Sequence, residues 1–175
     1  MTTPGGRLVT ANDAHLARFV IVTDKRATAH RPAAAARYQL SVGDAAPELD
    51  QRLSDELDRV NARATKGTAP ARELTVQVVD DEGNLAAGMS GWTWGVAAGI
   101  GMTWVREDAR GEGLGTRLLE EFEAEAKNRG CTHIVVTSFT FQAPGFYERH
   151  GYDEIFRWDD VPVVGAADVH FRKHL

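Results

Sequence analysis

The segment Arg110-Gly-Glu-Gly-Leu-Gly115 follows an apolar run and precedes an amphipathic stretch. Its three alternating glycines let the backbone turn tightly and approach a ligand without a Cβ clash. The stretch that follows has apolar residues at helical spacing, so its first turn directs unpaired N–H groups and a positive dipole end toward the loop. This order of strand, loop and helix predicts an anion site suited to a pyrophosphate. Arg110 and Arg117 could add charge-assisted hydrogen bonds to phosphate oxygens.

Other glycine-rich nucleotide loops fit this segment poorly. A Walker A loop requires Gly-Lys-Ser/Thr after its spaced glycines, and none follows here. A dinucleotide-binding fingerprint requires the spacing GxGxxG, whereas these glycines are spaced GxGxG. A helix start with no ligand stays open as the structural alternative, although alternating glycines weaken the start of a helix.

The flanking sequence predicts a mixed α/β domain over residues 46–175, preceded by a partly structured extension at residues 1–45. Apolar residues at helical spacing predict helices, and alternation of apolar and polar residues predicts strands. The predicted helices cover residues 47–64, 114–129 and 143–150. The predicted strands are Leu74–Val79, Leu85–Trp94, Ile100–Arg106, Ile134–Val136, Tyr152–Trp158 and Val169–Arg172. Turns are expected at residues 80–84 and 96–99.

Composition argues against several classes of protein. The chain has 175 residues, enough for one domain with a buried core, and no run of 18 apolar residues that would predict a membrane helix. A net charge of −5 disfavours nucleic acid as a partner, since such binding usually needs a basic face. A single cysteine and an N-terminus without a signal-like apolar run predict a cytoplasmic protein. We predict no metal site.

A second motif, Thr140-Phe-Gln-Ala-Pro-Gly-Phe-Tyr-Glu-Arg-His-Gly-Tyr152, lies downstream. Residues 105–119 resemble the acetyl-CoA loop of GNAT acetyltransferases, whose core pattern is Arg/Gln-x-x-Gly-x-Gly/Ala. The downstream motif is similar to that family's Ala-x-x-x-Tyr-x-x-x-Gly-Phe/Tyr. The matching residues are Arg110, Gly113, Gly115, Ala143, Tyr147, Gly151 and Tyr152. The resemblance extends from about residue 72 to residue 158.

The resemblance implies the GNAT fold, a mixed sheet of six to seven strands flanked by helices, and direct acetyl transfer from acetyl-CoA to an amine. The strand before the loop would diverge from the strand near 134–138, and the cofactor would lie between them. The cofactor-binding residues implied by the resemblance are Trp104, Val105, Arg110, Gly111, Glu112, Gly113, Leu114, Gly115, Thr116, Thr140 and Ala143. The chain departs from the family pattern at Thr140, where Asn is common, and at Glu107, where Pro is common.

The resemblance also implies that Tyr147 protonates the leaving thiolate, a role that suits a phenol because it is neutral at pH 7. Packing beside Phe146 is the structural alternative. An amine acceptor is mostly protonated at pH 7, so a general base or a water chain is expected to help. The family often has a Glu on a central strand, but residues 92–105 contain no carboxylate. Candidate bases are Glu73, Asp159, Asp160 and His170.

The expected acceptor is the primary amine of a small molecule, such as an antibiotic or a metabolite, with a protein N-terminus or lysine as the alternative. A non-catalytic module that binds acyl-CoA is the alternative from another class, and the presence of Tyr147 favours catalysis over it. Aromatic residues could line an acceptor pocket, although core packing explains them equally well: Trp92, Trp94, Phe139, Phe141 and Trp158. A homodimer is expected, with Trp92 or Trp94 as candidate contacts.

Overall fold

The computed structural model describes residues 40–44 and 46–175. The chain forms two compact units, and the larger unit contains residues Thr68 to Leu175. Helix α1 (Pro47–Ala64) belongs to the other unit. The predicted extension at residues 1–45 lies outside the described residues except for 40–44, so its structure stays a prediction.

Helix α1 has the bounds that its sequence predicts. Pro47 occupies the first turn, where its missing N–H has no helical partner to lose. Glu48 and Asp50 lie in the first turn and Arg63 lies in the last, so all three complement the helix dipole. None of its residues is buried, and Leu49 and Leu53 are about half exposed.

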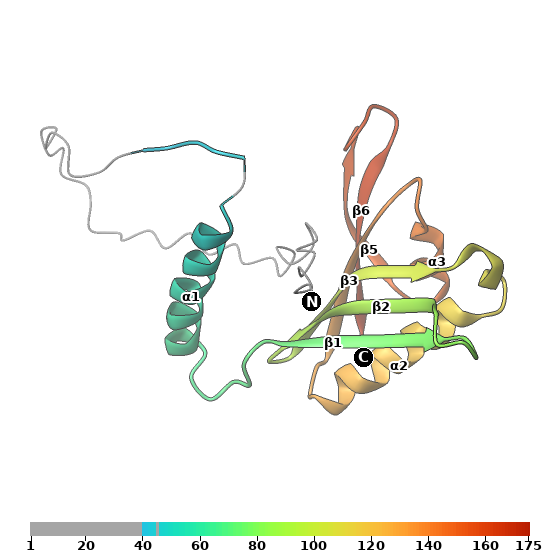
Figure 1. Cartoon of the computed structure of the whole chain (residues 1–175), viewed down its shortest axis with the longest axis horizontal. Helices are drawn as coiled ribbons and strands as arrows, with labels where there is room; N and C mark the ends of the chain where they lie inside the picture. Colours follow the sequence, from blue (N-terminus) through green and yellow to red (C-terminus); the bar gives the residue numbers. More distant parts are fainter. Residues whose placement is uncertain (1–39, 45) are drawn as a thin grey trace, which may run out of the picture. The chain divides into compact units, whose positions relative to one another are not determined.

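The larger unit is built on one six-stranded mixed sheet, which confirms the predicted fold class (Figure 1). The strand order is β1-β2-β3-β4-β6-β5, and only the β3–β4 pair is parallel. The strands are β1 Arg72–Val79, β2 Leu85–Trp94, β3 Ala97–Val105, β4 His133–Phe139, β5 Asp153–Asp159 and β6 Ala167–His174. The helical segments are a short 3-10 turn at Glu107–Ala109, α2 Leu114–Asn128 and α3 Pro144–Arg149.

Helices α2 and α3 cover the same face of this sheet. The apolar stripe of α2, which includes Leu118 and Phe122, joins the core with inward-facing strand residues such as Ile134. Tyr147 of α3 contacts the ring of Phe171 on β6, which is fully buried. Because successive side chains of a strand point to opposite sides of the sheet, one set faces these helices and the other set faces the opposite side. We call the helix side the covered face.

One predicted turn is wrong. Residues 97–99 are not part of a turn but begin β3, and the turn is confined to Gly95 and Val96. Trp92 is the register partner of Gly99, and a Cβ on Gly99 would lie 2.5 Å from the indole ring. The small residues that suggest a turn are needed because the indole lies across this part of the strand.

A bulge in β3 determines where the strand leaves its neighbour. On β2, Ser90 faces Met102 and Gly91 faces Ile100, so Gly101 is the extra residue of the ladder. A bulge bends its strand and increases the local twist. The parallel pairing of β3 with β4 runs from Ala97 to Ile100 and ends at this bulge. Beyond it, residues 101–105 of β3 and 137–139 of β4 are not paired with each other, and we call this region the split.

Candidate functional site

The glycine loop connects the end of β3, at one side of the split, to helix α2. Gly111 and Gly113 have φ angles of 84° and 76°, a left-handed conformation that suits glycine. Gly113 is the N-cap of α2, and no side chain in the described residues caps this end. The first turn of α2 holds no acidic residue. Its unpaired N–H groups and positive dipole end can therefore receive an anion.

The residues of the predicted pyrophosphate loop lie together at this helix start. Arg110, Gly111, Glu112 and Gly113 are exposed, and Leu114, Gly115 and Thr116 form the half-buried first turn. Arg110 donates from Nε to the carbonyl of Val105 at 3.3 Å. Trp104, on the part of β3 that does not pair with β4, is 48% exposed. The Arg110 hydrogen bond thus holds the loop against the end of β3.

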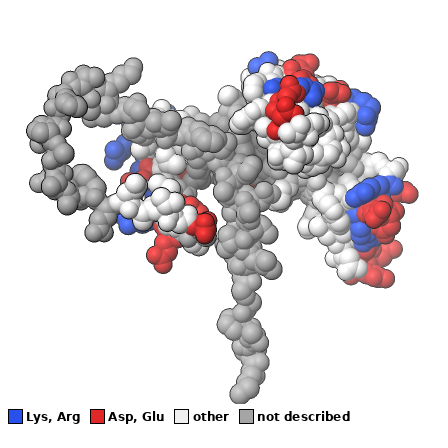
Figure 2. Space-filling model, turned by 90° about the horizontal axis from the view of Figure 1, so that it is seen from above, with Lys and Arg blue, Asp and Glu red and all other residues white. Residues whose placement is uncertain are grey.

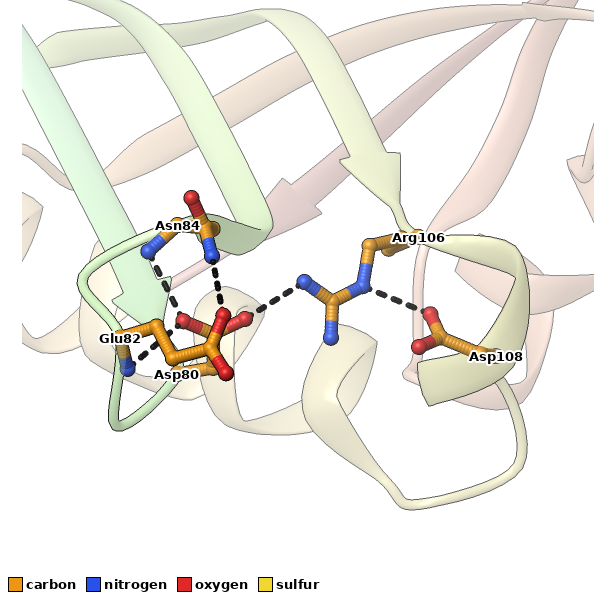
Figure 3. Close-up of polar contacts among 5 residues, drawn as sticks. All are labelled: Asp80, Glu82, Asn84, Arg106 and Asp108. Atoms are coloured by element: carbon orange, nitrogen blue, oxygen red, sulfur yellow. Dashed lines mark hydrogen bonds and ion pairs between the residues drawn. The ribbon is translucent and has the colours of Figure 1, made fainter.

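Arg106 ties the loop to the β1–β2 turn (Figure 3). Its Nη1 donates to Oδ2 of Asp80 at 2.8 Å, and its Nε donates to Oδ1 of Asp108 at 2.7 Å. The other oxygen of Asp80 accepts the N–H groups of Glu82 and Asn84. The Arg106 side chain is the main reason why the pKa of the Asp80 carboxyl lies below its usual value. The sequence motifs did not indicate this network, because it joins residues 26 positions apart.

Replacing Asp80 by Asn should lower the melting temperature at pH 7 and weaken coenzyme binding a few-fold, because the start of the loop loses its anchor. The folded-state pKa of Asp80 is depressed, so its contribution to stability is present above the unfolded value of about 3.9 and is lost as pH falls below it. The difference in melting temperature between wild type and Asp80→Asn should therefore shrink from pH 7 to pH 3. Asp81→Asn, an exposed neighbour in the same turn, is the control. A difference that persists at pH 3 would contradict the ion-pair explanation.

Tyr147 reaches the split from α3. Its side chain is 5% exposed, and its hydroxyl lies 3.2 Å from Oγ1 of Thr103, on the part of β3 that does not pair with β4. Its ring packs edge-on against Phe146, with centroids 5.1 Å apart. Burial raises the pKa of Tyr147, so the phenol keeps its proton at neutral pH. The ring is a core residue, and its hydroxyl lies where the two central strands part.

His150 joins the start of α2 to α3. The carbonyl of Phe146 can only accept, so Nδ1 of His150 donates to it at 2.7 Å. In the neutral imidazole Nε2 then accepts the hydroxyl proton of Thr116 at 3.0 Å. The Thr116 hydroxyl is therefore engaged within the protein, which leaves the backbone N–H as the group of Thr116 that could bind an anion. Both ring nitrogens of His150 therefore hold protein groups together, which is a structural role.

Thr140 and Ala143 form the far side of the site. The Thr140 hydroxyl accepts the N–H of Ala167 at 3.0 Å and retains its own proton for donation. Ala143 caps α3, and its N–H donates to the buried hydroxyl of Ser138 at 3.3 Å. Both residues stand where β4 ends, so they lie on the β4 side of the split.

More than half of the chain matches a known protein family. The family model described as "Acetyltransferase (GNAT) family" matches residues 38–152. The chain belongs to the GNAT acetyltransferase family. This membership confirms the prediction from the two sequence motifs and the predicted class of enzyme, whose acyl donor is acetyl-CoA.

Three relatives of this GNAT chain show how far the similarity extends. A blasticidin-S acetyltransferase of Streptomyces morookaense is 43% identical over 87 residues, which are 47% of this chain and 62% of that protein. An acetyltransferase of Agrobacterium fabrum is 30% identical over 108 residues, covering 62% of this chain and 78% of that protein. The crystal structure of an acetyltransferase from Bacillus cereus aligns with a TM-score of 0.68 at 30% identity, covering 78% of this chain and 98% of that one. The chain thus spans less than two thirds of the Streptomyces relative.

The aromatic residues suggested for an acceptor pocket of this GNAT domain separate into two groups. Phe139 stacks on Phe141 with centroids 5.2 Å apart, and Trp158 is 59% exposed on β5. Trp92 and Trp94 lie on β2, at the end of β3 where pairing with β4 is intact. Only the first group lies near the split.

The surface in Figure 2 carries acidic and basic side chains side by side rather than an extended patch of one sign. Ion pairs such as Lys173–Glu123 and Arg157–Glu154 likewise bring opposite charges together. In the part of the chain that the structure describes, no helix combines the length and apolar character needed to cross a membrane.

Proposed function

We propose that this chain is an N-acetyltransferase that moves the acetyl group of acetyl-CoA directly to the primary amine of a small molecule, an antibiotic or a metabolite. The observation that carries the proposal is the position of the Tyr147 hydroxyl, 3.2 Å from Thr103 on the part of β3 that does not pair with β4. The loop that starts α2 supplies the anion site. The Streptomyces relative named for blasticidin S supports a small-molecule acceptor.

In the proposed reaction the loop and the first N–H groups of α2 hold the pyrophosphate of the coenzyme. The backbone of Trp104 and Val105 holds its pantetheine arm, so that the thioester lies in the split. The amine nitrogen attacks the thioester carbonyl, the C–N bond forms and the C–S bond breaks. Tyr147 gives its proton to the departing sulfur, where negative charge builds up. The Thr103 hydroxyl keeps the phenol in place.

The test is release of free CoA thiol from acetyl-CoA with blasticidin S, other small amines, and peptides with a free N-terminus or lysine, with products identified by mass. We expect a small amine to be acetylated fastest. Faster acetylation of a peptide would replace the proposal with a protein acetyltransferase. Heat of acetyl-CoA binding without acetylation of any amine would favour a non-catalytic module. Light scattering of the same sample tests the predicted homodimer.

A further inference from the structure

The side chains of Asp168 and His170 form a pair on β6 that the coenzyme site does not use. Val169 and Phe171 on the same strand are fully buried in the core with α2 and α3. Alternation along the strand therefore places Asp168 and His170 on the opposite face of the sheet. His170 Nε2 lies 3.2 Å from Oδ2 of Asp168.

The strand register places this pair beside the split. His170 is the partner of Thr137 on β4, and Asp168 is the partner of Phe139. Residues 137–139 are the ones that have parted from β3. Since neighbouring strands lie about 4.8 Å apart, His170 stands one strand away from the edge where the thioester would lie. Tyr147 stands on the covered face, with its ring 6.1 Å from that of Phe171, the residue after His170.

The surroundings of the pair suit a cation. Phe139 and Trp158 flank Asp168 in the register, and Phe156 packs edge-on against His170 with centroids 5.3 Å apart. Aromatic faces beside a carboxylate favour an ammonium group. The register neighbours of His170 on β4 and β5, Thr137 and Phe156, carry no charge. Along β6 itself the charged residues on this face are Asp168 and the exposed Arg172.

The carboxylate of Asp168 is incompletely paired. Its Oδ1 and the Nε2 atom of His170 are both buried, and neither has a hydrogen-bond partner in the part of the chain that is described. Buried polar atoms without partners are rare. The 3.2 Å approach is an ion-pair distance without hydrogen-bond alignment, so the attraction needs a positive charge on the imidazole. The His170 side chain is 35% exposed although its Nε2 atom is buried, so its exposed area belongs to atoms other than Nε2.

We propose that His170 is the general base that deprotonates the acceptor amine, and that Asp168 is its positioning residue. This inference rests on the proposed function. The ammonium form of the acceptor gives one proton to Nδ1 of His170, and the carboxylate of Asp168 stabilises the resulting imidazolium. The neutral amine attacks the thioester, and Tyr147 protonates the sulfur. The second amine proton, lost as the amide forms, restores the phenol, and the imidazolium releases its proton to water.

The other candidate bases are less well placed. Glu73 lies on β1, three strands from β4 in the sheet order. Asp160 accepts the N–H of Gly165 at 2.9 Å and thereby closes the loop between β5 and β6. Asp159 is exposed at the end of β5, and its register partner is Ala167. His170 alone among the four candidates both lies beside the split and has a carboxylate, that of Asp168, within ion-pair distance of its ring.

The test compares His170→Gln, Asp168→Asn and the control His174→Gln, using the amine that wild type acetylates fastest. His174 lies on the same strand but pairs with His133, at the start of β4 and away from the split. We expect His170→Gln to lower kcat/KM about 10²-fold at pH 7, the lower end for general-base catalysis. The loss should shrink as pH rises toward the pKa of the amine, about 10, because the free amine then needs no base. Acetyl-CoA affinity, measured by calorimetry, should stay unchanged.

Asp168→Asn should lower kcat/KM to a smaller extent, with the same change in the pH profile, and His174→Gln should leave both unchanged. If His170→Gln loses the same factor in kcat/KM at every pH, His170 has a structural role and the proposal is overturned. A wild-type kcat/KM and pH profile in this variant would also overturn it. If wild type acetylates no amine at all, the proposed function fails and this inference falls with it. If wild type is active and His170→Gln matches it, only the assignment of the base fails.

Discussion

Tyr147→Phe is expected to slow acetyl transfer roughly 10- to 10³-fold while acetyl-CoA affinity stays nearly unchanged. The hydroxyl acts mainly when negative charge builds on sulfur, so it stabilises the transition state more than the bound substrate. The expected slowing extends below the usual general-acid effect of about 10²- to 10⁴-fold, because a thiolate already leaves readily. The ring is retained, so its contacts with Phe146 and Phe171 should hold. Single-turnover experiments measure the rate of transfer, calorimetry measures acetyl-CoA affinity, and the melting temperature shows whether the ring packing is kept.

Tyr152→Phe is the matched control. Tyr152 is also buried, packs 5.6 Å from the ring of Tyr147, and donates its hydroxyl proton to Glu123. Loss of this phenol should lower the melting temperature and leave the rate of transfer intact. If Tyr147→Phe transfers the acetyl group at the wild-type rate when chemistry limits turnover, the thiolate leaves unaided or is protonated by water. Tyr147 would then be a core residue only.

Gly113→Ala is expected to raise the dissociation constant of acetyl-CoA at least tenfold. An alanine at φ 76° is strained, and its added methyl group would meet no protein atom within 4 Å, so it occupies the space above the helix start. Gly115→Val should have a larger effect. A Cβ there lies 3.4 Å from the ring of Phe146, so the side chain crowds both the ligand and the residue before Tyr147.

Gly130→Ala separates strain from ligand contact. Gly130 follows the other end of α2, has a φ of 87°, and has equally open space around an added methyl group. Both alanine variants should therefore lose a similar amount of stability, roughly 1 kcal/mol for a left-handed residue, but only Gly113→Ala should lose coenzyme affinity. Calorimetry with purified protein decides the matter. Equal affinity in the two variants would contradict a role for the loop, and absence of binding heat in wild type would contradict the coenzyme site itself.

Local patterns in the sequence predicted the elements whose formation depends on nearby residues. Helix α2 follows from its apolar stripe and the glycines at its two ends, and β2 has the predicted bounds. The start of β3 was missed because its small residues are required by a partner on another strand, the indole of Trp92. The glycine loop and Tyr147 were recognisable because a contiguous motif carries each of them.

The remaining site features depend on contacts between distant segments. Arg106 meets Asp80 across 26 positions, and Thr103 meets Tyr147 across 44 positions. Gly101 is a bulge only because of how β2 and β3 are aligned. His170 was one of four candidate bases, and the sequence contained nothing to rank them. Strand order and register distinguish it, and neither is encoded in any short motif.

The bulge at Gly101 creates a strand edge in the middle of a sheet instead of at its border. Outer edges carry a risk, since their unpaired N–H and C=O groups can recruit a strand from another protein and start aggregation. Here the pairing from Ala97 to Ile100 still holds β3 against β4, so the two strands part from a closed end. A strand from another protein could pair between β3 and β4 only if it lay one strand spacing, about 4.8 Å, from each of them along its whole length. Strands that diverge from a closed end do not leave that space. A narrow amide-bearing chain has no such requirement, so the same geometry protects the edge from other proteins and leaves it open to a thin, extended ligand.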